Sequence, residues 1–223
     1  MKMKLLISAV TKFISGILLV GALVFLPSGT FEYTGGWLFM LLLFIPIFIM
    51  GVLLFVKSPE LLQKRLDGKE KETTQKGVVA LSGIMFLGGF IVAGLDFRFG
   101  WSRVPNTVKF IASVLFLVSY ALYAEVMREN VYLSRKIEVL ENQTVVSTGL
   151  YGIIRHPMYA ATVLMFCTFP FVLGSYVACP LFFTYPFIIA ARIKGEEKLL
   201  TEQLSGYDEY KKKVKYKLIP FIW

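Results

Sequence analysis

The stretch QTVVSTGLYGIIRHPMY, residues 143–159, leads into an apolar run, yet it contains residues that membrane-spanning segments normally exclude. It holds the only histidine of the chain, His156. A proline disfavours helical backbone at the residue before it, while its own fixed φ suits the first position of a helix. The order Arg155-His156-Pro157 therefore predicts that His156 stands at the start of a helix that continues from Met158.

Such a helix start has the properties of an anion-binding site. The first N–H groups of a helix lack partners and carry a partial positive charge, so they can bind a carboxylate or a phosphate. Arg155 and His156 would strengthen this site. Upstream, Ser-Thr-Gly at 147–149 is typical of a turn, which would fold Tyr151 back toward the same point. Taken alone, these residues are equally compatible with a loop at the lipid headgroups, with a snorkelling arginine and an anchoring tyrosine.

The composition indicates a membrane protein. The chain has 223 residues, of which 56% are hydrophobic, and a mean hydropathy of +0.65. These values are too apolar for a soluble domain of this length. The net charge is +9, but the basic residues lie between apolar segments, where they set orientation and contact anionic lipid rather than nucleic acid. With a single histidine and two cysteines inside apolar segments, the sequence offers no recognisable set of metal ligands.

A helix needs about 20 apolar residues to cross the hydrocarbon core. The last two apolar runs are shorter and are separated only by Gly174-Ser175, so they should form a tight hairpin that need not span fully. We predict an all-α polytopic integral membrane protein with five to six transmembrane helices, the last two a hairpin, and a cytoplasmic C-terminal amphipathic helix. The apolar runs are 13–26, 37–56, 78–95, 108–127, 158–173 and 176–191.

The distribution of charge predicts the orientation in the membrane. All but three of the 24 Lys and Arg residues lie at the N-terminus, in the connections 57–77 and 128–157, or after residue 191. By the positive-inside rule, that side is the cytoplasm. We therefore expect a multi-pass protein with both termini and residues 143–159 in the cytoplasm. The membrane would be the plasma membrane of a bacterium or the endoplasmic reticulum of a eukaryote.

The polar segments have simpler interpretations. Residues 57–77 should form a short helix along the headgroups and then a solvated turn, and Glu129 to Glu141 should be extended or interfacial. After residue 191 the pattern becomes amphipathic, so a helix should continue into the cytoplasm. Arg192 and Glu196 are four residues apart and project from one face of that helix, which by itself indicates a weak surface ion pair. A lysine cluster near the end suits anionic headgroups: Lys211, Lys212, Lys213, Lys215 and Lys217.

Several of these motifs together resemble one family. They are QTVVSTGLYGIIRHPMY, Arg192-x-x-x-Glu196-Glu197, Gly206-Tyr207-x-x-Tyr210-x-x-x-Val214 and Ile219-Pro220. In this order they are similar to the isoprenylcysteine carboxyl methyltransferases, integral-membrane enzymes that use S-adenosylmethionine. The broader set also includes the phospholipid N-methyltransferases. The resemblance covers roughly the C-terminal 95 residues and implies that 128–223 form the cofactor-binding catalytic half. From length and apolar runs we expect a single membrane domain, 1–223, in which 1–127 form four transmembrane helices.

The resemblance also implies roles for individual residues. Arg192 would face the methyl acceptor. We assign Glu196 to the α-ammonium of the cofactor and the helix start at His156 to its α-carboxylate, with Tyr151 or Tyr159 beside the sulfonium or adenine. The implied cofactor contacts are Gln143, Thr144, Val145, Val146, Tyr151, His156, Pro157, Met158, Tyr159 and Glu196.

A carboxylate acceptor is the first interpretation. It is ionised at pH 7 and needs no general base, so alignment and exclusion of water would provide most of the catalysis. Arg192 could hold it. A lipidic or prenylated acceptor could enter from the bilayer, and we expect no obligate protein partner. The chain departs from the family pattern at Leu140, Leu150 and Ala161, which leaves the identity of the acceptor open.

Three other functions remain open. A phosphatidylethanolamine N-methyltransferase would need a base, for which Glu197 and Glu138 are candidates, and it would gain nothing from Arg192 beside a cationic acceptor. A protein similar to the sterol reductases would bind a nicotinamide cofactor, but this chain is short for one. A channel or small transporter would place ionisable residues within its spans, which here are nearly free of charge.

Overall fold

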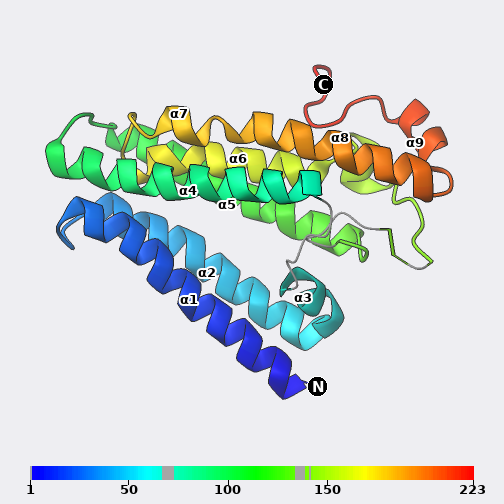
Figure 1. Cartoon of the computed structure of the whole chain (residues 1–223), viewed down its shortest axis with the longest axis horizontal. Helices are drawn as coiled ribbons and strands as arrows, with labels where there is room; N and C mark the ends of the chain where they lie inside the picture. The colour runs from blue at the N-terminus through cyan, green and yellow to red at the C-terminus, as the bar shows by residue number, and fades with distance from the viewer. Residues whose placement is uncertain (1, 67–72, 134–138, 141) are drawn as a thin grey trace.

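The protein is a bundle of long helices, seen from the side in Figure 1. The computed structural model describes residues 2–66, 73–133, 139–140 and 142–223, and every regular element in them is helical. In chain order these are α1 (Lys2–Ser28), α2 (Thr34–Lys57), α3 (Pro59–Leu66), α4 (Thr73–Phe99), α5 (Asn106–Glu129), the 3₁₀ turn η1 (Gly149–Gly152), α6 (Pro157–Leu173), α7 (Cys179–Phe182), α8 (Tyr185–Gln203) and α9 (Tyr207–Lys213).

Among these, α1, α2, α4 and α5 are long and apolar enough to cross a membrane. This confirms the predicted all-α polytopic membrane fold. The helix α6 is apolar but has only 17 residues. At 1.5 Å per residue it is about 26 Å long, slightly less than the ~30 Å hydrocarbon core. The apolar first part of α8 is shorter still, and the helix then continues through the charged residues to Gln203, as predicted.

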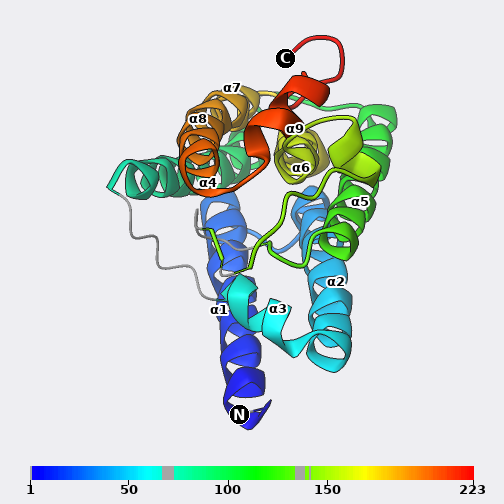
Figure 2. The ribbon, with the colours of Figure 1, turned by 90° about the vertical axis from the view of Figure 1, so that its right-hand side faces the viewer.

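The short helix α6 lies at the centre of the bundle, next to α2, α4, α5 and α8 (Figure 2). Phenylalanine rings fill the space around it. The ring centroid of Phe169 on α6 lies 4.7 Å from that of Phe39, 5.0 Å from Phe116 and 5.7 Å from Phe182. Lipid is as apolar as these rings, so close packing holds membrane helices together. The phenylalanine cluster thereby joins α2, α5, α6 and α7 and fixes where α6 begins.

The predicted hairpin is present, but its second arm is not one helix. Gly174 ends α6 in the left-handed conformation, with φ +84°. The chain then forms α7, bends at Phe183, and starts again as α8. Pro180 and Pro186 occupy the first turns of α7 and α8. Because proline lacks an N–H and clashes with a preceding helical turn, each residue starts a new helix instead of continuing the previous one.

The connection after α2 differs from the prediction. We expected a solvated connector along the headgroups, but α3 buries Leu61 and Leu62. Leu61 packs with Val126 and Tyr151, which lie at the end of α5 and in η1. Lys12 of α1 also donates a hydrogen bond to the carbonyl of Leu66 at the end of α3. The helix α3 is therefore part of the bundle. The rest of this turn, residues 67–72, lies outside the described residues, as do residues 134–138 and 141 of the segment 129–141 that we expected to be extended or interfacial.

Candidate functional site

A polar pocket opens at one end of the bundle, where α5 ends, α6 begins and α8 meets α9. It encloses about 840 Å³ of empty space, part of it open to solvent. Its walls come from the 130–159 region and from α8 and α9: Asn130, Tyr132, Leu133, Gln143, Thr144, Val145, Val146, Tyr151, Arg155, His156, Met158, Tyr159, Glu196, Leu199, Leu200, Leu204, Tyr207 and Tyr210.

The turn η1 positions Tyr151 in this wall. It begins at Gly149, whose φ of +52° favours glycine and where a Cβ would overlap the carboxylate of Glu129. That carboxylate accepts the N–H of Leu150 at 3.0 Å and so holds the turn against the end of α5. The hydroxyl of Tyr151 accepts a hydrogen bond from Asn130 at 2.9 Å. The predicted turn thus folds Tyr151 back to the start of α6.

The helix α6 begins where the sequence predicted, directly after His156. Pro157 is the first helical residue, and His156 before it has non-helical backbone angles, φ −125° and ψ 60°. The backbone N–H groups of Arg155 and His156 donate to the carbonyls of Tyr216 and Lys217, both at 2.9 Å. The next N–H groups belong to Met158 and Tyr159, which line the pocket. Their position in the first turn leaves them without helical partners, so they can bind an anion.

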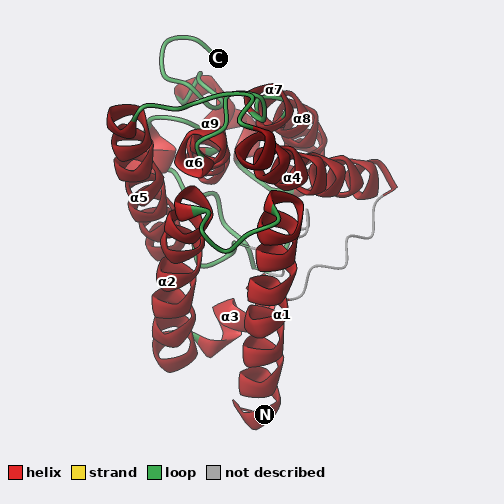
Figure 3. Cartoon of the chain, turned by 90° about the vertical axis from the view of Figure 1, so that its left-hand side faces the viewer, coloured by secondary structure: helices red, strands yellow, loops and turns green. Residues whose placement is uncertain are grey.

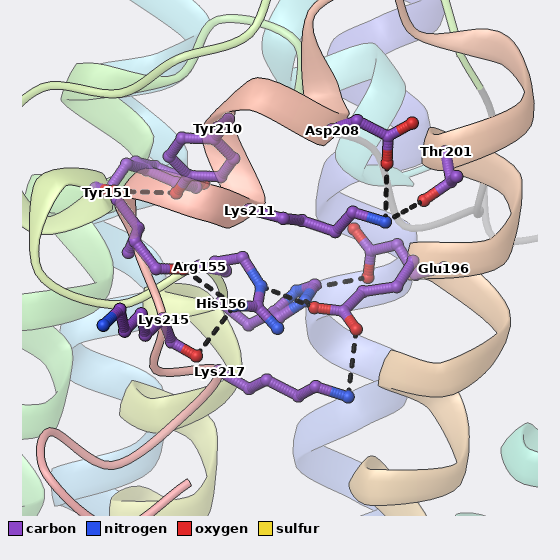
Figure 4. A network of polar contacts seen from close by, with 12 residues as sticks. Tyr151, Arg155, His156, Glu196, Thr201, Asp208, Tyr210, Lys211, Lys215 and Lys217 are labelled. Atoms are coloured by element: carbon purple, nitrogen blue, oxygen red, sulfur yellow. Dashed lines mark hydrogen bonds and ion pairs between the residues drawn. The ribbon is translucent and has the colours of Figure 1, made fainter.

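Next to the pocket, the carboxylate of Glu197 contacts the side chains of Arg155, His156 and Lys217, and these three partners are labelled in Figure 4. Arg155 Nε lies 2.7 Å, Lys217 Nζ 3.0 Å and His156 Nε2 3.2 Å from its oxygens. Burial raises the pKa of Glu197, but the hydrogen bonds from His156, Arg155 and Lys217 outweigh it and lower the pKa to about 2. Glu197 is therefore an ionised structural anchor that fixes the His156 ring.

Two buried polar atoms beside the pocket have no hydrogen-bond partner among the described residues. They are Oε2 of Glu196 and the hydroxyl of Tyr207. Oε2 of Glu196 lies 3.9 Å from Nδ1 of His156, which is beyond hydrogen-bonding distance. A buried polar atom without a partner is costly, and native proteins rarely leave one unexplained. These two atoms are suited to a ligand that offers both a cationic donor and a polar group.

A second, mainly apolar cavity adjoins the pocket. It encloses about 910 Å³ of empty space, part of it open to the surroundings. Met158 and Tyr159 line both cavities and form the wall between them. Nε of Arg192 donates to the hydroxyl of Tyr159 at 3.0 Å and is thereby oriented in the second cavity. The described lining is Arg65, Val78, Val79, Ser82, Gly83, Phe86, Tyr123, Met158, Tyr159, Thr162, Tyr185, Ile189 and Arg192.

The structure brings together the residues that the sequence selected. All the predicted cofactor residues except Pro157 line the polar pocket, and Pro157 instead begins the helix behind it. Arg192 lines the other cavity. Although Arg192 and Glu196 are four residues apart on α8, Glu196 lines the polar pocket and Arg192 lines the second cavity. Their roles toward a cofactor and an acceptor stay predictions.

Sequence reasoning missed several residues of the site. Asn130 lies outside the motifs, and only the fold brings it to Tyr151. Lys217, which we had assigned to anionic headgroups with the other lysines, instead lies 3.0 Å from Glu197. Arg65 was taken for part of a solvated connector, and nothing in its local sequence distinguishes it. Tyr207, in contrast, belongs to a motif that had been noticed but was given no role.

Fold and site together define a class: a helical membrane protein with a polar ligand pocket at one end and an apolar cavity behind a shared wall. Residues 110–202 match the family model of the isoprenylcysteine carboxyl methyltransferase (ICMT) family. This match confirms the resemblance to the family and supports a membrane methyltransferase of that kind. No individual curated protein gives a significant match. The matched region contains the wall between the two cavities and both Arg192 and Glu196.

Proposed function

We propose that this protein transfers a methyl group from S-adenosylmethionine to the carboxylate of an isoprenylcysteine-like or other lipidic acceptor. One observation carries the proposal. Two cavities of opposite character meet at Met158 and Tyr159, with the Glu196 carboxylate on one side and the Arg192 guanidinium on the other. This arrangement suits a cationic group of a cofactor on the first side and an anionic acceptor on the second.

The polar pocket fits the groups of S-adenosylmethionine. The unpartnered Oε2 of Glu196 would accept from the α-ammonium, and the first turn of α6 would bind the α-carboxylate. The unpartnered hydroxyl of Tyr207 is a further polar contact. Apolar side chains such as Leu200 and Leu204 offer a surface for adenine. When bound, the cofactor supplies an electrophilic methyl group on a sulfonium.

The apolar cavity fits a lipidic anion. Its charged lining residues in the described part of the chain are two arginines, Arg65 and Arg192. Its remaining walls come largely from α4, α6 and α8, and Val79 on α4 is half exposed on the outer surface. A lipid tail could therefore enter sideways from the bilayer while its acidic head stays beside the arginines.

The proposed reaction requires no proton transfer by a side chain of the protein. A carboxylate is already ionised at pH 7, so no side chain has to remove a proton from it. Arg192, oriented by Tyr159, would hold the acceptor and exclude water from the wall between the cavities. Its grip would have to be partial, because full bidentate binding would weaken the nucleophile.

Methylation of an amine is the weaker alternative. An ammonium acceptor would meet two arginines in the second cavity and would need a base. Glu197, one of the two candidates, holds three partners and has a pKa near 2, so it is a poor base at neutral pH. The other candidate, Glu138, lies outside the described residues.

The proposal includes the orientation in the membrane. The helix α1 starts, α2 ends, α6 begins and α8 ends at the same end of the bundle (Figure 1), and in the sequence most Lys and Arg residues flank these helix ends. By the positive-inside rule this end would face the cytoplasm, where S-adenosylmethionine is available. Lys109, Arg98 and Arg103 lie between or beside the helix ends on the other side.

The test is a transfer assay with S-adenosylmethionine labelled on the methyl group and the purified protein in lipid nanodiscs. One acceptor would be a prenylated cysteine derivative with a free carboxylate, another its amide, and a third phosphatidylethanolamine. We expect label in the lipid phase only with the carboxylate, and mild alkali should release it as methanol because an ester is hydrolysed. Alkali-stable label on phosphatidylethanolamine would overturn the choice of acceptor, and no transfer to any lipid would overturn the activity.

A further inference from the structure

The residues after α9 form a closed structure that the proposed function does not use. We call residues 214–223 the hook. The backbone N–H groups of Leu218 and Ile219 both donate to the carbonyl of Trp223, at 2.9 and 3.0 Å, and the N–H of Trp223 donates back to Ile219 at 3.1 Å. Leu218 is buried in the core of the bundle. The hook is thus anchored at its base and closed at its tip.

The tip of the hook presents apolar side chains outward. Phe221 is 86% and Ile222 78% exposed, and Ile219 and Trp223 are partly exposed beside them. Phe221 has φ +65°, a left-handed conformation that a bulky side chain rarely adopts. Exposed apolar residues gathered on an ordered loop usually mark a contact surface.

Basic residues precede this tip along the chain. Lys212, Lys213 and Lys215 are exposed, and within the described residues they make no ion pair. Aromatic and aliphatic side chains next to several lysines are the combination that binds the boundary between the headgroups and the acyl chains of an anionic membrane.

The location of the hook fits that boundary. In Figures 1 and 2 the end of the chain lies on the outer flank of the bundle, beside α8 and α9. Along the length of the bundle it lies level with the first turns of α4 (Figure 1), whose apolar span begins at Lys76. That is the depth at which a membrane helix leaves the hydrocarbon core.

We infer that the hook inserts Phe221 and Ile222 into the headgroup boundary of an anionic bilayer, with Lys212, Lys213 and Lys215 on the lipid phosphates. The inference does not depend on the proposed function. The hook also contacts Arg155, which precedes α6 and lines the pocket. Nη1 of Arg155 donates to the carbonyls of Val214 and Lys215 at 2.7 and 2.8 Å.

The experiment uses Trp223 as its own probe. In the full chain with Trp37→Phe and Trp101→Phe, Trp223 is the single tryptophan. The protein is placed in nanodiscs of phosphatidylcholine with or without phosphatidylglycerol, carrying bromine near the headgroup end or near the methyl end of the acyl chains. We expect quenching by bromine near the headgroups, stronger with phosphatidylglycerol, and protection from aqueous acrylamide.

Two variants sharpen the result. Phe221→Ser with Ile222→Ser should lose the bromine quenching and expose Trp223 to acrylamide. Changing Lys212, Lys213 and Lys215 to Gln should remove the dependence on phosphatidylglycerol, whereas Lys2→Gln with Lys4→Gln, at the start of α1, should not. In the unmodified chain, amide exchange in the hook should slow in anionic discs.

Three results would overturn the inference. The first is full acrylamide access to Trp223 in anionic discs, with no bromine quenching. The second is protection that appears only when two copies share a disc, which would make the hook a contact between copies. The third is amide exchange in the hook that is the same in both lipids.

Discussion

Each end of the bundle contains a carboxylate that several donors contact, and the surroundings of the two carboxylates differ. At the end shown in Figure 3, Asp96 is 1% exposed and accepts from the backbone and hydroxyl of Ser102, at 2.7 and 2.6 Å, and from the hydroxyl of Ser175. At the other end, Glu197 holds Arg155, His156 and Lys217.

The difference lies in what surrounds each carboxylate. Asp96 joins the α4–α5 connection to the turn after α6 through neutral donors, and this arrangement is complete. All the contacts of Glu197 are made within the protein as well, but the preceding residue, Glu196, has a buried oxygen with no partner among the described residues, and it lines a pocket. A satisfied carboxylate stabilises a fold, whereas an unsatisfied one beside a cavity indicates a ligand.

The largest effect should come from Arg192→Ala. Removing the cation from the acceptor cavity should lower kcat about 10²- to 10³-fold, as is typical when one preorganised charge-stabilising donor is lost. Binding of S-adenosylmethionine should persist, because Arg192 does not line the polar pocket. Steady-state kinetics of methyl transfer would measure this. Lys194→Ala, an exposed cation two residues along, is the control, and normal turnover by Arg192→Ala would mean that the arginine has no part in the reaction.

Asp96→Ala should affect stability and leave the pocket intact. The change leaves the donors of Ser102 and Ser175 without their acceptor, which should cost about 3 kcal/mol of unfolding free energy. Thermal unfolding in detergent would show a lower Tm, with unchanged affinity for the cofactor at a temperature where the variant is folded. The exposed Asp208→Ala is the control. A large loss of affinity in folded Asp96→Ala would contradict the separation of the two ends.

A smaller effect distinguishes two neighbouring tyrosines. Tyr207→Phe removes a hydroxyl that has no partner among the described residues, so Tm should not fall, while affinity for S-adenosylmethionine should drop about three- to tenfold, the value of one hydrogen bond. The hydroxyl of Tyr210 donates to the carbonyl of Tyr151 at 2.7 Å, so Tyr210→Phe should lower Tm instead. The reverse pattern in calorimetry and thermal unfolding would remove Tyr207 from the ligand site.

The smallest effect concerns pH. Because the pKa of Glu197 is lowered in the folded state, its stabilising contribution is complete above the unfolded value near 4.3 and is lost as pH falls toward 2. The difference in Tm between the parent and Glu197→Gln should therefore stay constant from pH 8 to 5 and narrow below about pH 4. A difference that stays the same from pH 5 down to pH 2 would show that the network is not anchored by an ionised Glu197.

Much of this molecule could be predicted from its sequence because membrane helices and proline-defined helix starts depend on local chemistry. Apolar runs of sufficient length predicted α1, α2, α4 and α5, and Pro157 predicted where α6 begins. We predicted one helix for the second arm of the hairpin, because its apolar run is continuous. Pro180 and Pro186 instead start separate helices, α7 and α8.

The site was predictable where its residues form a motif and not where the fold assembles it. Spacing placed Arg192 and Glu196 on one face of α8 but could not show that Tyr159 separates their cavities. The approach of α3, which carries Arg65 to the acceptor cavity, depends on contacts with α1, α2 and α5 that no local pattern encodes.

The central claim is that the polar pocket binds the cofactor and the apolar cavity binds the methyl acceptor. Calorimetric titration of S-adenosylmethionine into the parent, Glu196→Gln, Arg192→Ala and the exposed control Glu202→Gln tests it most directly. We expect Glu196→Gln to lose about ten- to a hundredfold in affinity, the value of a hydrogen bond to a charged group, while Arg192→Ala and Glu202→Gln bind as the parent does. Binding by Glu196→Gln at the parent's affinity, or an equal loss in Arg192→Ala, would contradict the account.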